Sequence, residues 1–416
     1  MEKAMDRRVS EKRSEMFWKL IWPVIIIVLL GGAMLLSTGC GGGGGGNTAS
    51  TPQNQNNNDP PPDDKKQNPP PDQNNNPPPD DKKDDPPSSL NYKFIATGDM
   101  AIARNGHTAT LLNNGDVLVA GGWNIKAFQS GAELYHPDTG VFEVINDMPF
   151  KASAHTAILL SDGRVFMYGM GAAIYDPMTK KFTSIPKEGS IQRIWHTATI
   201  LLDGRILIAG GIDNTWGSVL LQSAVLYNPT TGVYSSTGSM VRSRDGHTAT
   251  LLADGRVLIT GGGDFYNDAE IFDPTTGKFT IIANTMRQRR LFHTATLLKN
   301  GKVAIMGGTT YTDIEIFDAT THKFSLGGYL RVKRNNNHTA TLLSDGKIFI
   351  TGGLSEGGIV SSEIYDPETG VSSSINNMLY PRYWHASTLL QNGKVLITGG
   401  ASAPNSGYLK SAEVME

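Results

Sequence analysis

One pattern repeats seven times between residues 91 and 416, and it constrains the fold more than any other feature of the chain. Each copy runs from a histidine through an Asn-Gly or Asp-Gly pair and an apolar run to a second glycine. The two glycines follow the histidine at fixed distances, eight residues and then six more. Copies that recur every 41 to 51 residues are typical of a repeat architecture. Repeats 1 to 7 begin at His107, His155, His196, His247, His293, His338 and His385.

Each copy predicts four short β-strands, named a to d in chain order. In repeat 4 we expect strands at 247–252, at 257–260, at 269–272 and from 278 onward. The Asx-Gly pair between strands a and b predicts a two-residue type I′ turn, which needs positive φ at both positions. The segment Asp-Pro-Thr-Thr-Gly predicts the turn between strands c and d. Because the apolar runs do not alternate with polar residues, both faces of each sheet must be covered, and stacking sheets around an axis does this.

The ends of the repeat region predict how the stack closes. The seventh copy stops at 411–416, which aligns with strand c and leaves no strand d. Residues 92–97 match strand d of other copies, so we expect them to complete the last sheet and cover two open edges. The prediction is an all-β, seven-bladed propeller over residues 91–416, with its last blade closed by the N-terminal strand.

Three motifs point to a known repeat family. Gly-Gly follows strand b, Glu-x-Tyr/Phe-Asp-Pro lies in strand c, and Arg-x-x-His precedes strand a. Together they resemble kelch repeats, such as those of the central domain of galactose oxidase. The chain has no Trp-Asp dipeptide, which argues against WD repeats. Repeat 2 has Lys180, and repeat 5 has His322, where other copies have glycine, so we expect irregular blades there.

The first 90 residues are not globular in composition. The apolar stretch 20–36 is short and interrupted by glycines, which favours a signal peptide at 1–39 over a spanning helix, with an uncleaved membrane anchor as the alternative. Ser-Thr-Gly-Cys at 37–40 resembles the lipobox of bacterial lipoprotein precursors, which implies lipidation of Cys40 and a stable anchor in the membrane. Residues 40–90, rich in Gly, Pro, Asn and Asp, are predicted to be a disordered linker. We expect a lipid-anchored monomer of the bacterial cell envelope, at the outer membrane or cell surface.

The connections between strands carry the candidate binding residues. The b–c connections vary in length, whereas the segment from the strand c turn to the next histidine always spans 19 or 20 residues. Variable loops on a fixed frame commonly hold binding sites. The d–a connections contribute thirteen basic residues against Glu188 and Asp245, with aromatic residues between them. A net charge of −2 gives no reason to expect nucleic acid. The candidate ligand-binding residues are Arg287, Arg289, Arg331, Lys333, Trp195, Trp384, Trp123 and Trp216.

Other recurring polar residues are assigned to structure. Arginine three residues before the histidine (104, 193, 244, 290 and 382) recurs with glutamate in strand c (133, 270, 315, 363 and 413), and we expect these to form pairs between blades. Seven histidines around a ring cannot converge on one metal ion, so we expect no metal and no cofactor, and a hydrogen bond from each histidine to the neighbouring blade.

Three classes of function remain open. A copper oxidase with a Tyr–Cys cofactor is excluded because Cys40, the one cysteine, lies outside the repeats. A sugar-modifying enzyme resembling sialic-acid mutarotase would need an acid over the channel, and Glu188, Asp213, Asp264 and Glu356 are candidates that no spacing singles out. We expect a non-enzymatic module that recognises a glycan or a protein through arginine and aromatic residues. A structural scaffold of an envelope complex is the third possibility.

Overall fold

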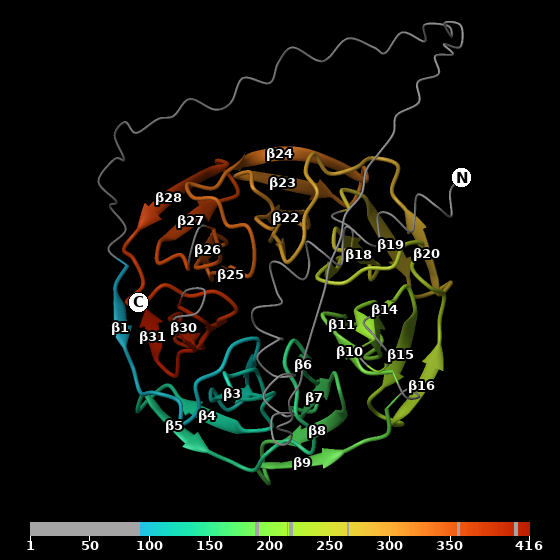
Figure 1. Cartoon of the computed structure of the whole chain (residues 1–416). Helices are drawn as coiled ribbons and strands as arrows, with labels where there is room; N and C mark the ends of the chain where they lie inside the picture. The colour runs from blue at the N-terminus through green and yellow to red at the C-terminus, as the bar shows by residue number, and fades with distance from the viewer. Residues whose placement is uncertain are drawn as a thin grey trace, which may run out of the picture. The chain divides into compact units, whose positions relative to one another are not determined.

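A computed structural model describes residues 92–416, except 188–190, 214, 216–218, 264–265, 356–357 and 403–406. The predicted signal peptide (1–39) and the linker (40–90) with Cys40 lie outside the described residues. The described residues form β-strands and no helix (Figure 1), so none of them belongs to a helix that could cross a membrane.

All but three of the strands form seven antiparallel sheets of four strands each, and the other three form a small additional sheet. Repeats 1 to 3 supply β2 (Thr108–Leu111), β3 (Val117–Ala120), β4 (Ala132–His136), β5 (Val141–Val144); β6 (Thr156–Leu159), β7 (Val165–Tyr168), β8 (Ala172–Asp176), β9 (Lys181–Ser184); and β11 (Thr197–Ile200), β12 (Ile206–Ala209), β15 (Ala224–Asn228), β16 (Val233–Ser236). Repeats 4 to 6 supply β17 (Thr248–Leu251), β18 (Val257–Thr260), β19 (Ala269–Asp273), β20 (Lys278–Ile281); β21 (Thr294–Leu297), β22 (Val303–Met306), β23 (Asp313–Asp318), β24 (Lys323–Tyr329); and β25 (Thr339–Leu342), β26 (Ile348–Thr351), β27 (Ser362–Asp366), β28 (Val371–Ile375). The last sheet contains β29 (Ala386–Leu389), β30 (Val395–Thr398), β31 (Ala412–Met415) and β1 (Phe94–Ala96).

The sheets are arranged around an axis, with strand a of each innermost and strand d outermost (Figure 1). β1 pairs antiparallel with β31, Phe94 opposite Met415 and Ala96 opposite Glu413, so the N-terminal strand is the outermost strand of the last sheet. The inner strands β2 and β29 are also in contact, which brings the first repeat next to the seventh. The prediction of an all-β propeller is confirmed.

The turns between strands a and b differ from the prediction. In repeat 1 the N–H of Gly115 donates to Leu112 O at 3.0 Å, and the N–H of Leu112 donates to Asp116 O at 2.8 Å. Only the glycine has positive φ, +91°, so this is a three-residue loop with a type I turn and a glycine bulge, and not a type I′ turn. The Asx residue has a different role from the one predicted: its side-chain oxygen accepts the N–H two residues on, as Asp162 does from Arg164 at 3.0 Å.

The turns between strands c and d tolerate a missing glycine. In repeat 4 the N–H of Gly277 donates to Asp273 O at 2.8 Å with φ at +66°. Lys180 and His322 adopt the same left-handed conformation, both at φ +54°. Repeats 2 and 5 therefore keep all four strands. Repeat 5 is irregular as expected, because the pairing of its strands c and d shifts register at a bulge between Ile314 and Glu315, whereas the pairings of repeat 2 run without a shift.

The hydrophobic core is divided among seven clusters, each between two neighbouring sheets. Strand b is buried along its whole length in every repeat, as in β18 (Val257–Thr260), because it faces a neighbouring sheet on both sides. One cluster joins Val117 and Tyr135 of repeat 1 to Leu390 and Leu396 of repeat 7. Packing between the first and last sheets thus resembles packing between sheets that follow each other in the chain.

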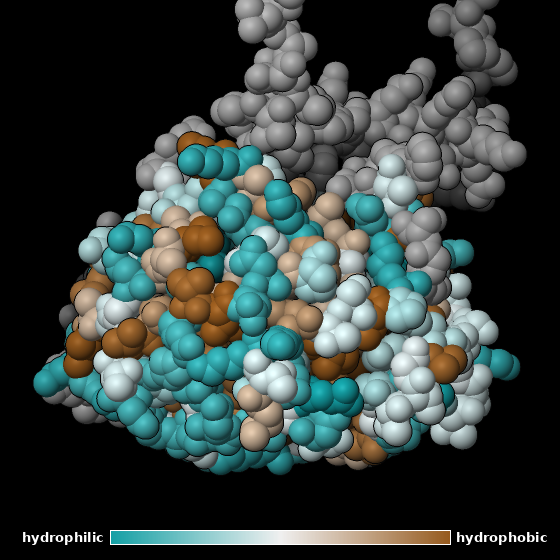
Figure 2. Space-filling view, turned by 90° about the horizontal axis from the view of Figure 1, so that it is seen from below, coloured by the Kyte–Doolittle hydropathy of each residue, from teal (hydrophilic) through white to brown (hydrophobic). Residues whose placement is uncertain are grey.

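The outer strands are only partly covered. Val141 and Val144 of β5 are 54% and 64% exposed. Apolar residues of this kind lie among polar ones on the side of the molecule that Figure 2 shows. Because successive strands run in opposite directions, the a–b and c–d turns share one end of every sheet, here called the turn face. The b–c and d–a connections share the opposite end, here called the loop face.

Candidate binding face

The seven repeat histidines are buried and link neighbouring repeats. In six of them Nε2 is hydrogen-bonded to the threonine that begins strand a of the preceding repeat, at 2.9 to 3.1 Å. For example, His247 lies 2.9 Å from Thr197. His107 closes the series with Thr398 of repeat 7 at 2.8 Å, since Ala386 stands where the other repeats have the threonine. Burial lowers the pKa of these histidines, to about 3 for His247, so they are neutral links that do not present a free imidazole.

Six arginines are fully buried behind the loop face. In repeat 1, Arg104 Nη2 donates to Glu133 Oε1 at 2.7 Å and Nη1 donates to Gly121 O at 2.8 Å. The second oxygen of Glu133 accepts the N–H of Ala101 at 2.7 Å. The pair therefore fixes the d–a connection to the start of the b–c connection. Corresponding pairs are Arg244–Glu270, Arg290–Glu315, Arg334–Glu363 and Arg382–Glu413.

Two features of these arginines differ from the prediction. The pairs form within one repeat, because each arginine lies in a d–a connection and binds strand c of the sheet that follows it, and not between blades as we expected. Arg334 belongs to the set although it lies four residues before its histidine, so an Arg-x-x-His search misses it. Arg193, which has Val225 in place of the strand c glutamate, donates to Gly210 O at 2.9 Å and Ser223 Oγ at 2.9 Å. Repeat 2 has neither charge, with Ala152 and Ala173 at the two positions.

A closed ring of backbone hydrogen bonds surrounds the axis at the residue before each histidine, here called the inner ring. Each N–H donates to the carbonyl of the preceding member at 2.9 to 3.3 Å. All seven members have positive φ, between +52° and +58°. The members are Gly106, Ala154, Trp195, Gly246, Phe292, Asn337 and Trp384.

The inner ring holds two of the predicted binding residues. Trp195 and Trp384 are both partly buried, and the Trp195 and Phe292 rings are 5.6 Å apart across Gly246. A left-handed conformation costs a bulky residue about 1–2 kcal/mol more than it costs glycine. Aromatic residues at three such positions are therefore a reason to look for a role beyond chain geometry.

A second layer of short pairings covers part of the loop face, here called the loop layer. In it, the residue two before the histidine pairs with the residue that follows Gly-Gly, which in turn pairs with the returning b–c loop. Repeat 3 extends this into a three-stranded sheet of β10 (Arg193–Ile194), β13 (Ile212–Asp213) and β14 (Val219–Leu220), which is an addition to that repeat and not a further blade. The other rows are Asn105–Trp123–Phe128, Asn336–Leu354–Gly358 and Tyr383–Ala401–Tyr408.

The remaining predicted binding residues lie in different sectors of the loop face. Trp123 belongs to the loop layer of repeat 1, and its Nε1 donates to Tyr408 Oη of repeat 7 at 3.1 Å. Arg289 and Lys333 are exposed on the d–a connections that lead into repeats 5 and 6. On the same connections, exposed Arg287 has its Nε 3.7 Å from Asp313, and Arg331 is exposed with its N–H bonded to Glu363. Trp216 lies outside the described residues.

The acidic candidates do not assemble into a catalytic pair in the part of the chain that the structure describes. Glu188, Asp264 and Glu356 lie outside that part. Burial alone would raise the pKa of Asp213, but hydrogen bonds from Thr215 and Gln192 outweigh it and lower the pKa. The described residues also contain no group of three or more His, Cys, Asp or Glu placed to hold a metal ion.

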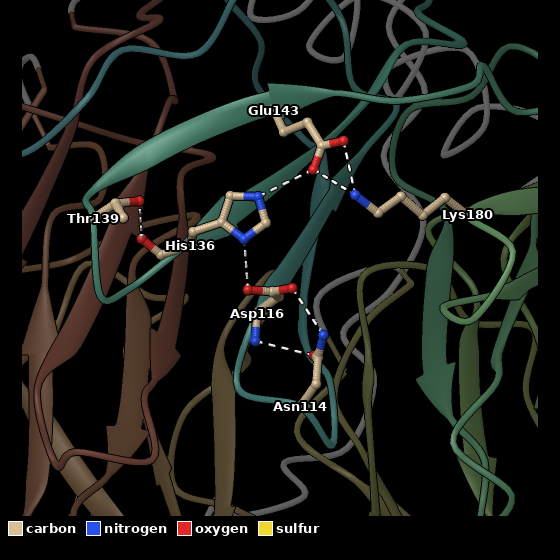
Figure 3. Close-up of polar contacts among 6 residues, drawn as sticks. All are labelled: Asn114, Asp116, His136, Thr139, Glu143 and Lys180. Carbon is tan, nitrogen blue, oxygen red and sulfur yellow. Dashed lines mark hydrogen bonds and ion pairs between the residues drawn. The ribbon is translucent and has the colours of Figure 1, made fainter.

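A separate polar cluster lies on the turn face of repeats 1 and 2 (Figure 3). His136 Nδ1 is 2.7 Å from Asp116 Oδ1, and Nε2 is 3.1 Å from Glu143 Oε2. Lys180 of repeat 2 donates to both oxygens of Glu143, at 2.7 and 2.8 Å. Burial opposes a charge on the imidazole, but the two carboxylates outweigh it and raise the pKa of His136. Sequence analysis missed this cluster because His136 stands where the other complete repeats have Asp or Asn.

Comparisons with known proteins agree with this architecture. An F-box/kelch-repeat protein from Arabidopsis thaliana is 25% identical over 161 residues, 30% of this chain and 32% of that protein. The chain thus spans about a third of the length of the curated relative that it matches. Among solved structures, a fungal alcohol oxidase of the AA5 family in complex with copper matches with a TM-score of 0.62 and 16% identity, covering 78% of this chain and 75% of that chain. No family model matches the chain.

The repeat motifs, the sheet order and these likenesses define the fold as a kelch-type β-propeller. The fold serves a copper oxidase as well as kelch-repeat proteins, so it is compatible with catalysis and with binding. A Tyr–Cys copper cofactor does not fit this chain, because residues 91–416 contain no cysteine.

Proposed function

We propose that this protein is a non-enzymatic, glycan-binding propeller of the bacterial cell envelope that uses its loop face. The observation that carries this proposal is the arrangement of four consecutive sectors around the ring. Exposed Arg289 and Lys333 lead into repeats 5 and 6, and partly buried Trp384, Tyr408 and Trp123 follow in repeats 7 and 1. A glycan that carries carboxylates could place its acidic groups on the basic sector and its sugar rings on the aromatic sector.

The buried residues support binding over catalysis. The histidines and the recurring arginines are hydrogen-bonded inside the frame, so they hold the loops in place and do not face a substrate. Asp213, which hydrogen bonds keep in its ionised form, is a poor general acid at neutral pH. Fixed loops with variable exposed side chains are typical of a recognition surface.

We further propose that lipidated Cys40 tethers the propeller to the membrane. The support is the lipobox-like segment Ser-Thr-Gly-Cys at 37–40 and the proline-rich stretch after it. Metabolic labelling of the full-length chain with a fatty-acid analogue should label the wild type and leave C40S unlabelled. Label on C40S would contradict lipidation at this thiol.

Binding can be tested on a glycan array with the full-length protein in detergent. We expect the wild type to bind acidic oligosaccharides, and R289A/K333A to bind them about tenfold more weakly, since two charge-assisted contacts are lost. The matched control K278A/K323A removes two exposed lysines from the turn end of β20 and β24 and should bind as the wild type does.

Two outcomes would contradict the proposal. Turnover of a bound sugar by the wild type would establish an enzyme. Absence of glycan binding, together with a defined protein partner bound equally by wild type and R289A/K333A, would favour a scaffold.

A further inference from the structure

We infer that five aromatic residues of repeats 7 and 1 form a continuous stacking surface for uncharged sugar rings of a glycan chain. We call these residues the closing band: Trp384, Tyr383, Tyr408, Trp123 and Phe128. The inference rests on the proposed function, because it names the part of the loop face that contacts the sugar rings.

Two rows of the loop layer bring four of these side chains together. In repeat 7, Tyr383 pairs with Ala401, and Ala401 pairs with Tyr408. Residues directly opposite in antiparallel pairs point to the same face, so the two tyrosines flank a small alanine on one surface. In repeat 1, Trp123 pairs with Phe128 in the same way, and their rings are 4.8 Å apart.

The two rows join each other and the inner ring. Trp123 Nε1 donates to Tyr408 Oη at 3.1 Å, which connects the b–c loops of repeats 1 and 7. Trp384 lies in the inner ring, with its ring 6.5 Å from that of Tyr383. The closing band therefore extends from the inner ring outward across the junction of the first and last repeats. All five residues are partly buried, so each is held by its neighbours and still has exposed surface.

A polar group beside the closing band suits a ligand with hydroxyl groups. Asn337, which is only partly buried, precedes Trp384 in the inner ring. Aromatic faces for the apolar side of a sugar ring, with an amide group beside them, provide both kinds of contact that a sugar needs.

The arginines beneath the closing band are not available to a ligand. Arg104 and Arg382, three residues before His107 and His385, are fully buried and paired with Glu133 and Glu413. They therefore offer no free charge to a ligand from beneath the band. The aromatic rings stack on the uncharged part of the glycan, and an acidic group of the same glycan could reach exposed Lys126, between Trp123 and Phe128, or the basic sector of repeats 5 and 6.

The test measures binding of three hexasaccharides to the full-length protein by calorimetry: cellohexaose, chitohexaose and hexagalacturonate. We expect at least one of the two uncharged probes to bind. W123A and W384A should each weaken its binding about tenfold, because each removes one stacking surface. Y408F keeps the ring and removes only the acceptor for Trp123 Nε1, so we expect a smaller loss of two- to threefold. The control V141A/V233A changes exposed residues of outer strands away from the band and should bind as the wild type does.

The outcomes separate this inference from the proposed function. If W123A and W384A bind every probe as the wild type does while R289A/K333A loses hexagalacturonate, the closing band is wrong and glycan binding stands. If the wild type binds none of the three probes, both are overturned. Circular dichroism and the unfolding midpoint of each variant identify any loss of binding that comes from misfolding, and W123F then replaces W123A.

Discussion

The N–H of Gly106 donates to the carbonyl oxygen of Trp384 at 2.9 Å, which joins the first repeat to the last. The two residues are neighbours in the inner ring, and both have positive φ, +58° and +54°. Glycine adopts this conformation without strain, whereas a residue with a Cβ does not. The inner ring therefore contains strained and unstrained versions of the same backbone position.

This difference gives the first prediction, for A154G. Ala154 has φ at +52°, and its small side chain contributes little packing. Replacing it with glycine should raise the free energy of unfolding by about 0.5–1 kcal/mol, because the strain is relieved. The reverse change G106A should lower it, since the new Cβ would also lie 2.7 Å from Ser153 Oγ. Urea unfolding followed by tryptophan fluorescence measures both, and equal effects of the same sign would contradict the role of strain.

The buried ion pair of repeat 6 gives the second prediction. R334A leaves Glu363 buried without its partner and should lower the free energy of unfolding by about 3–5 kcal/mol. R334A/E363A reproduces the two alanines of repeat 2. Its loss in free energy of unfolding should be smaller than the sum of the losses in R334A and E363A. A double variant as unstable as that sum would show that the two side chains do not interact.

The sequence predicted the strands well because the repeat spacing is fixed by the sheets themselves. Each apolar run must fill the space between two sheets, so Val257–Thr260 and its counterparts could be placed without a structure. The turn type was wrong because Asx-Gly is compatible with several turns, and composition does not reveal the hydrogen bond that the N–H of Arg164 donates to Asp162.

The candidate site was less predictable. Arg289 and Lys333 could be predicted to be exposed because, unlike the buried arginines, they do not recur at the same position in the other repeats. The link between Trp123 and Tyr408 does not, because the two residues are 285 positions apart and meet only when the first and last repeats come together. The arginine pairs were assigned to the wrong partner sheet, since sequence spacing cannot tell a strand in the same blade from one in the next.

The His136 cluster gives a pH-dependent prediction. Its raised pKa means that the folded state holds the proton more tightly than the unfolded state, whose histidine has a pKa near 6.5. The stabilisation is therefore fully present below pH 6.5 and is lost as the pH rises through the folded pKa. H136N introduces the residue that repeat 3 has at this position. Its free energy of unfolding should be lower than that of the wild type at pH 5.5, and the difference should be much smaller at pH 9. A difference that stays constant between these pH values in urea unfolding would contradict a charged imidazole.

The buried histidines predict the opposite dependence on pH. Their pKa values are lowered by burial, to about 4 for His155 and about 3 for His196 and His338. Between pH 6.5 and these values the unfolded chain binds protons that the folded chain does not, so the free energy of unfolding should fall as the pH falls from 6.5. Each such histidine contributes about 1.4 kcal/mol per pH unit within this range.

A single substitution tests this contribution. H247Q can keep a hydrogen bond to Thr197 and does not titrate, so the slope of stability against pH between 4.5 and 6 should fall by about 1.4 kcal/mol per pH unit. Replacing the exposed threonine in T275Q, on the turn face of repeat 4, should leave the slope unchanged. Urea unfolding at several pH values measures both variants. If H247Q and the wild type had the same slope, His247 would bind its proton as well in the folded chain as in the unfolded chain. That result would contradict a pKa lowered by burial of the imidazole and by the charge of Arg244.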